Sequence, residues 1–141
     1  HPLVERSAFN FILIRYAEVL LTYAEAQNEA SGPDQSVYDA INQLRRRPDI
    51  NMPEVPKGLT KDQMREVIRR ERRIELTFEG LYYSDILRWK TAEKENNGMM
   101  HNYDGIEVVK RSFNPKRDYL WPIPYNQTVL NPNLEQNPNW D

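Results

Sequence analysis

The spacing of apolar and polar positions along the chain predicts four amphipathic helices, over about residues 11–30, 35–47, 60–79 and 81–95. Apolar residues recur every three or four positions in each, as one buried face of an α-helix requires. In the first helix, the predicted face carries Leu13, Tyr16, Ala17, Leu20, Tyr23, Ala24 and Gln27. The small side chains of Ala17 and Ala24 would allow a partner helix to approach closely.

Helix boundaries are marked by residues with known local preferences. Residues 31–34, Ser-Gly-Pro-Asp, end the first helix and begin the second. Three prolines and a glycine predict a loop over residues 48–59. Residues 60–63, Thr-Lys-Asp-Gln, match a capping box that opens the third helix.

The four helices predict an all-α fold in which two helical hairpins follow each other in a tetratricopeptide-like arrangement. The spacing between the pairs is nearer to about 50 residues than to the ~34 of that repeat, and the loop at 48–59 accounts for the excess. Residues 105–112 are compatible with one short strand. We expect residues 1–141 to form a single domain.

The last part of the chain, residues 113–141, has a composition that opposes regular structure. Its stretch 119–140, YLWPIPYNQTVLNPNLEQNPNW, holds two tryptophans, two tyrosines, four prolines and five asparagines. Proline interrupts helices and central strands. From the residues alone, this tail is compatible with an aromatic surface for a ligand, a proline-rich peptide ligand or a structural belt packed on the helices.

The third helix places two carboxylates where apolar residues are expected. At 100° per residue, Glu71 and Glu75 fall within the apolar stripe, while most of its arginines fall on the opposite face. Because a buried carboxylate without a partner costs several kcal/mol, each should meet a cationic or backbone donor. The candidate partners are Arg72, Arg15 and Arg88.

Ion pairing explains these glutamates better than chemistry does. Two carboxylates one turn apart could act as the acid and base of a glycosidase, but one helix inside a core is a poor place for a sugar. A four-helix di-iron site would need Glu-x-x-His motifs, whereas the two histidines are His1 and His101. We therefore expect no metal site.

Composition narrows the remaining classes of function. The net charge is −2, and acidic residues alternate with the arginines, which opposes nucleic-acid binding. The chain has no cysteine, so disulfide and thiolate chemistry do not arise. No nucleophile–base arrangement or glycine-rich phosphate loop occurs. We expect no catalytic residue and no cofactor.

Four segments of the chain stand out together: RYAEVLLTYAEAQNEA at 15–30, INQLRRR at 41–47, IRRERRIELTFEGLYYSDILRW at 68–89, and the stretch at 119–140. In this order they resemble the SusD/RagB family of outer-membrane nutrient-binding lipoproteins. Each segment alone is moderately specific, but four in the family's order cover nearly the whole chain. The first residue is His1 rather than methionine, so we expect the sequence to be the C-terminal portion of a longer SusD-like chain.

The resemblance implies a function without catalysis. Members of the family lie at the cell-surface face of the outer membrane, held by a lipid anchor, and cover a SusC-like TonB-dependent transporter. They bind oligosaccharides, polysaccharides or other nutrients. An alternative is a helical-repeat scaffold that docks the transporter without touching the glycan. No ligand-binding residue can be transferred from the family, and the nutrient is not specified.

The resemblance favours the structural interpretation of the tail. Members that take different nutrients share this stretch, so we expect Trp121 and Trp140 to be buried against the helices. Glu71, Glu75, Arg72 and Arg88 are the other expected structural residues.

For carbohydrate contact the best local candidates are Tyr103, Asn102 and Asp104, in a predicted loop at 96–105. Stacking on Tyr103 would suit a sugar ring, although an ordinary surface loop explains the same residues.

Overall fold

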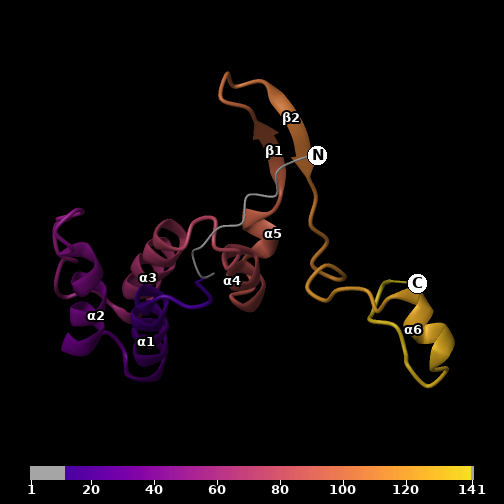
Figure 1. Ribbon diagram of the computed structural model, residues 1–141, viewed down its shortest axis with the longest axis horizontal. Helices are drawn as coiled ribbons and strands as arrows, with labels where there is room; N and C mark the ends of the chain where they lie inside the picture. The colour runs from indigo at the N-terminus through magenta and orange to yellow at the C-terminus, as the bar shows by residue number, and fades with distance from the viewer. Residues whose placement is uncertain (1–11, 141) are drawn as a thin grey trace, which may run out of the picture. The chain divides into compact units, whose positions relative to one another are not determined.

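The computed structural model describes residues 12–140, and within that range it contains six helices and one two-stranded sheet (Figure 1). The chain divides into two compact units between Glu79 and Gly80. Gly80 has φ +79°, a left-handed conformation that residues with a Cβ rarely adopt. The two units are treated separately below as the first unit and the second unit.

The first unit consists of α1 (Tyr16–Ser31), α2 (Gln35–Arg45) and α3 (Lys61–Glu75). Gly32, at φ +87°, terminates α1 and donates its N–H to the Asn28 carbonyl. The Asp34 carboxylate caps α2 by accepting the N–H groups of Ser36 and Val37. The predicted capping box at the start of α3 is present, with Thr60 and Gln63 each accepting the other's backbone N–H.

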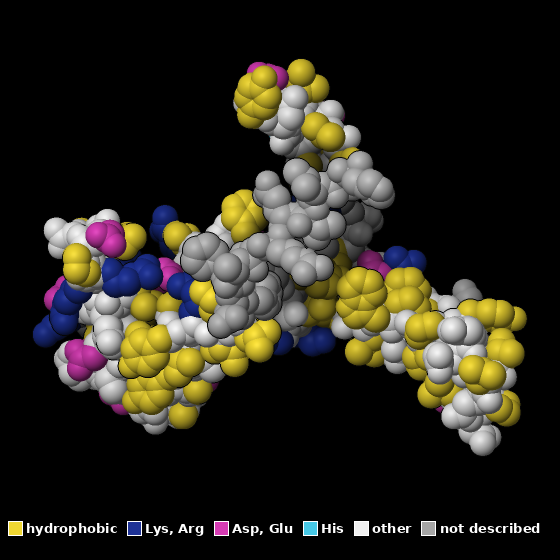
Figure 2. Space-filling model, in the orientation of Figure 1, with side chains coloured by type: hydrophobic (Ala, Val, Ile, Leu, Met, Phe, Trp, Pro, Cys, Tyr) yellow, Lys and Arg dark blue, Asp and Glu magenta, His cyan; other side chains and the backbone are white. Residues whose placement is uncertain are grey.

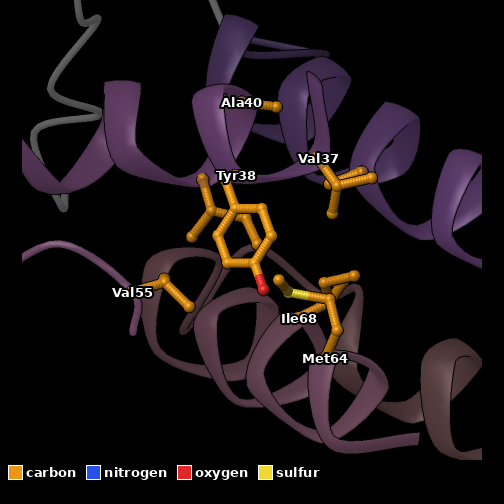
Figure 3. Packing of buried hydrophobic residues seen from close by; sticks show 8 residues of the cluster. Val37, Tyr38, Ala40, Val55, Met64 and Ile68 are labelled. Carbon is orange, nitrogen blue, oxygen red and sulfur yellow. The ribbon is translucent and has the colours of Figure 1, made fainter. Parts of the chain in front are cut away.

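The core of the first unit lies between the inner faces of its three helices. Ala24 of α1 is fully buried, and its small side chain lets α1 approach the other two helices. Figure 3 shows side chains of α2 directed toward those of α3. The buried cluster is formed by Ala24, Val37, Tyr38, Ala40, Ile41, Val55, Met64 and Ile68.

The connection between α2 and α3 is irregular, as the prolines predict, but it is tied to α2. The buried Asn42 side chain accepts the Val55 N–H at 2.9 Å, and the Tyr38 hydroxyl accepts the Leu59 N–H at 3.1 Å. Both bonds satisfy backbone donors that no helix or strand would pair. Val55 therefore enters the core from a segment without regular structure.

The second unit contains α4 (Tyr82–Arg88), α5 (Ala92–Glu95), β1 (Gly98–His101), β2 (Glu107–Arg111) and α6 (Tyr125–Leu130). Its small core joins Ile86 and Ala92 to Phe113, which begins the tail. The rings of Phe113 and Tyr119 meet edge to face, with centroids 4.9 Å apart. Figure 2 shows hydrophobic side chains gathered on the surface around α6 and the adjoining tail.

The expectation of an all-α fold is wrong in one respect, because residues 98–111 form a β-hairpin. β1 and β2 pair antiparallel, with Gly98 opposite Arg111 and Met100 opposite Val109. The sequence predicted a loop at 96–105 and an unpaired strand at 105–112. The partner strand was missed because its four residues, Gly-Met-Met-His, lack the β-branched residues that mark strands.

The helices are also shorter than their apolar patterns predict. Arg15 is extended, so α1 begins at Tyr16 and leaves Ile12, Leu13 and Ile14 outside it and exposed. Position 11, where the pattern began, lies outside the described residues. α2 ends at Arg45 rather than 47, and α3 ends at Glu75 rather than 79.

The fourth predicted helix is divided into α4 and α5. Lys90 has φ +57°, which no α-helix accommodates, and it separates the two segments. The described chain is thus mostly helical with a small sheet. A tetratricopeptide-like arrangement of its helices is consistent with this structure and stays a prediction, as does a single domain over residues 1–141.

Candidate functional site

Glu75, at the end of α3, is held by two arginines from other parts of the first unit. Its Oε1 accepts hydrogen bonds of 2.9 Å from Arg15 Nη1 and from Arg47 Nη1, and its Oε2 accepts one from Arg47 Nη2. The side chain of Glu75 is 15% exposed. Arg15 Nε also donates to both carboxylate oxygens of Glu79, at 3.0 Å each. Arg15 Nη2 donates to the Glu75 carbonyl at 2.8 Å.

Glu71, one turn earlier, has a different arginine. Arg45 donates from Nε at 3.1 Å and from Nη2 at 2.7 Å to the same carboxylate oxygen, Glu71 Oε1. Its remaining nitrogen, Nη1, reaches the Pro53 carbonyl in the α2–α3 connection. Both carboxylates therefore point inward, as the helical wheel predicts, and both meet guanidinium groups.

Of the three predicted donors, Arg15 binds one of these glutamates, Glu75. Arg72 is buried and donates to the Thr22 hydroxyl at 3.1 Å, with Glu25 4.0 Å away. Arg88 donates to Asp85 at 2.8 Å and lies over the Trp89 ring. The sequence missed Arg45 and Arg47, although both belong to the quoted segment INQLRRR. Carboxylates bound by guanidinium groups are poor general acids, which favours the structural interpretation of Glu71 and Glu75.

The arginines change the acid–base behaviour of Glu75. Burial by itself raises the pKa of the Glu75 carboxyl, but hydrogen bonds from Arg47 and Arg15 outweigh it and hold the pKa below its ordinary value of 4.5. Near that pH the unfolded chain consequently binds more protons than the folded chain. The stabilising contribution of Glu75 is complete above about pH 4.5 and is lost as the pH falls through the lower folded pKa.

We expect Glu75→Gln to weaken the acid sensitivity of the first unit. The urea midpoint of the natural chain should fall more steeply between about pH 5 and about pH 3 than that of the variant, because glutamine does not titrate. Far-UV circular dichroism measures the transition. Parallel pH profiles for the two proteins would show that Glu75 does not contribute to the acid sensitivity.

The three carbohydrate candidates meet at the turn of the β-hairpin. The Asn102 side-chain oxygen accepts the N–H groups of Asp104 and Ile106, at 3.0 and 2.9 Å, so this side chain shapes the turn. Asp104 is exposed, and the side chain of Tyr103 is 97% exposed. The turn presents one aromatic ring to solvent without a surrounding wall.

Trp121 does not lie where the sequence predicts. It is 69% exposed instead of being buried against the helices, and its ring meets Tyr83 edge to face at 6.0 Å between centroids. Trp140 is partly buried within the tail itself. Its indole N–H donates to the Leu120 carbonyl at 2.9 Å, and Arg117 lies over its ring at 4.5 Å. Contacts within the second unit, which the sequence pattern does not encode, replace the predicted burial.

Tyr83, Trp121 and Trp140 line a pocket of about 150 Å³ in the second unit, which we call the aromatic pocket. Its remaining lining residues are Asn96, Ser112, Phe113, Asp118 and Leu120. The sequence singled out the two tryptophans for a structural role and did not group them with these polar residues. Their positions range from 83 to 140, so no local pattern could have identified the pocket.

A wider hollow of about 460 Å³ lies in the first unit beside α1 and α2. Its basic lining residues are Arg15, Arg46 and Arg47, and each is paired with a glutamate: Glu75 or Glu79, Glu54, and Glu75. The positive charge of this hollow is therefore already compensated within the chain. Across residues 12–140 there is no group of three or more residues placed to hold a metal ion.

The chain belongs to the SusD family, whose model matches residues 4–140. Among curated relatives, SusD-like protein P2 of Formosa agariphila is 37% identical over 136 residues, covering 93% of this chain and 26% of that protein. SusD-like protein P38 of the same organism is 31% identical over 134 residues, covering 91% and 24% respectively. The predicted family resemblance is thereby confirmed. The chain spans about a quarter of the length of these relatives.

Solved structures show the same fold. A SusD-like carbohydrate binding protein from Bacteroides fragilis superposes with a TM-score of 0.78 at 37% identity, over 87% of this chain and 28% of that chain. A SusD homolog from Bacteroides thetaiotaomicron gives a TM-score of 0.72 at 32% identity, over 95% and 30%. The mostly helical chain with its small sheet thus has a SusD-like fold.

The family is associated with a particular cellular location. Proteins of the SusD family are typically outer-membrane lipoproteins at the cell surface. Within residues 12–140, none of the helices combines the length and the apolar character needed to cross a bilayer.

Proposed function

We propose that this chain takes part in non-catalytic nutrient binding at the cell surface, with a glycan as the favoured nutrient and a SusC-like TonB-dependent transporter as the partner. The observation that carries the proposal is the similarity of this chain to the SusD-like carbohydrate binding protein from Bacteroides fragilis, at 37% identity over 87% of this chain. The outer membrane is the corresponding location. No step of the proposed function requires a cofactor, a metal ion or a catalytic residue.

The second unit supports this proposal by its surface chemistry. Exposed aromatic rings and nearby polar groups are the usual means of holding sugars, whose C–H faces stack while their hydroxyls exchange hydrogen bonds. Trp121 and Tyr103 offer such rings at two places in this unit. Asp118 and Ser112 lie beside the first ring, and Asp104 lies next to the second.

A glycan array followed by calorimetry tests the proposal. The samples are this chain, the Bacteroides fragilis relative, and a chimera in which this chain replaces the matching part of the relative. We expect at least one oligosaccharide to bind this chain or the chimera. If the relative binds its glycan while neither this chain nor the chimera binds any, the proposed glycan function is wrong.

A second candidate function, docking of the transporter without glycan contact, is favoured by a specific feature of α1. Tyr16, Val19 and Tyr23 are exposed on the helix at spacings of three and four residues, so they form an apolar face on the outside of the first unit. A detergent-solubilised SusC-like transporter that binds this chain, and loses binding with Tyr16→Ser and Tyr23→Ser, would support docking. Retained binding by this double variant would argue against that face.

A further inference from the structure

The aromatic pocket differs from the hairpin turn in having walls on several sides. Aromatic rings from α4 and from both ends of the tail surround it, and polar groups lie between them. Its volume of about 150 Å³ is small beside the ~300–1,000 Å³ of ordinary ligand sites. The space suits one small ring rather than a whole oligosaccharide.

The Trp121 ring is exposed, but the backbone that carries it is fixed. The Asn137 side chain donates to the Trp121 carbonyl at 2.7 Å, and Trp140 donates to the adjacent Leu120 carbonyl at 2.9 Å. Gln136 brackets Ile123 with two further bonds, accepting its N–H at 2.8 Å and donating to its carbonyl at 2.9 Å. With the backbone held in this way, only the side-chain torsions of Trp121 lose freedom when a ligand stacks on its ring.

The polar groups of the pocket favour a neutral ligand rich in hydroxyl groups. The Asp118 carboxylate, whose pKa is lowered mainly by its hydrogen bond to Arg117, stays ionised and accepts hydrogen bonds. Ser112 and Asn96 can both donate and accept. The nearby cation, Arg117, is engaged with Asp118 and with the Trp140 ring, which leaves the pocket without a cation for an anionic ligand.

We propose that the aromatic pocket is a subsite for one neutral sugar ring, in which Trp121 is the stacking platform and Asp118, Ser112 and Asn96 contact the hydroxyl groups. The Tyr83 and Trp121 rings meet at an interplanar angle of 69° and so form a corner. The edge of the sugar ring would rest in this corner. This inference rests on the proposed glycan function and names the place and size of its ligand.

Titration with neutral sugars tests the subsite. The probes are the methyl glycosides of glucose, galactose, mannose and xylose, together with the best oligosaccharide from the array. Binding is followed by saturation-transfer NMR and calorimetry on this chain and on the chimera. We expect Trp121→Ala to weaken binding by roughly tenfold or more, because the stacking surface is removed. Trp121→Phe, which keeps an aromatic face, should restore most of the affinity.

Two controls separate this site from its alternatives. Tyr125→Ala removes another exposed ring of the tail, 82% exposed, that does not line the pocket, and it should leave binding unchanged. Tyr103→Ala removes the ring of the hairpin turn, which is the rival position for the sugar. If Trp121→Ala binds as tightly as the parent while Tyr103→Ala does not, the subsite is overturned and the glycan function stands. If no sugar binds the chain or the chimera, both proposals fail.

Discussion

Replacing Ile41 by alanine is expected to lower the free energy of unfolding of the first unit by about 2–5 kcal/mol. Ile41 lies on α2, is fully buried, and belongs to the cluster that joins α2 to Met64 and Ile68 of α3. Alanine would remove three carbon atoms from a closely packed core and leave a cavity that the neighbouring helices cannot fill. This is the largest effect we expect from a single substitution in the unit.

Urea unfolding followed by two signals measures the effect. Far-UV circular dichroism reports mainly on the three longest helices, which are in the first unit, while all three tryptophans are in the second unit and provide a separate fluorescence signal. The matched control is Ile74→Ala, since Ile74 is 63% exposed on α3 and should change stability by less than about 0.5 kcal/mol. Equal losses for the two variants would show that the core is not where we place it.

Replacing Glu75 by alanine should destabilise the first unit by about 2–4 kcal/mol, near the lower end of what breaking a buried ion pair costs. The expected loss is moderated because Arg15 and Arg47 are both partly exposed and can regain water. Stability is lost because two guanidinium groups are left without the carboxylate that they share, and not because an apolar contact is removed. Arg15 would retain Glu79, whereas Arg47 would lose the carboxylate to which it donates from both Nη1 and Nη2.

The control for this variant is another glutamate of the same helix. Glu66 is 75% exposed and pairs with Arg69 at 3.5 Å, so Glu66→Ala should cost less than about 1 kcal/mol. Urea unfolding by circular dichroism compares the two variants with the parent. A Glu75→Ala protein that unfolds at the same urea concentration as Glu66→Ala would refute the argument from inward-facing carboxylates.

The parts of this fold that local chemistry determines could be predicted. α2 and α3 combine an apolar face with a side-chain cap on the preceding residue, Asp34 or Thr60, so their starts at 35 and 61 were predicted to within one position. The family was recognised because four motifs occur in order. The inward direction of Glu71 and Glu75 followed from helical periodicity alone.

The parts of the fold that depend on contacts between distant residues could not be predicted from the sequence. Three consecutive arginines at 45–47 give no sign of which carboxylate each will reach, since the path of the chain after α2 decides it. The exposure of Trp121 depends on how the tail hydrogen-bonds to itself through Asn137 and Gln136. The aromatic pocket combines residues from positions 83 to 140. The sequence therefore pointed to Trp121 and Trp140 but not to the residues that surround them.

The bond between Arg15 and Glu75 also has a kinetic consequence. The two residues are 60 positions apart in the chain, so forming their contact requires closing a long loop, whereas the contacts between α1 and α2 join neighbouring segments. Contacts that close long loops tend to form after local ones. We therefore expect this ion pair to be absent from the folding transition state, so that Glu75 governs how slowly the first unit opens and has little influence on how fast it folds.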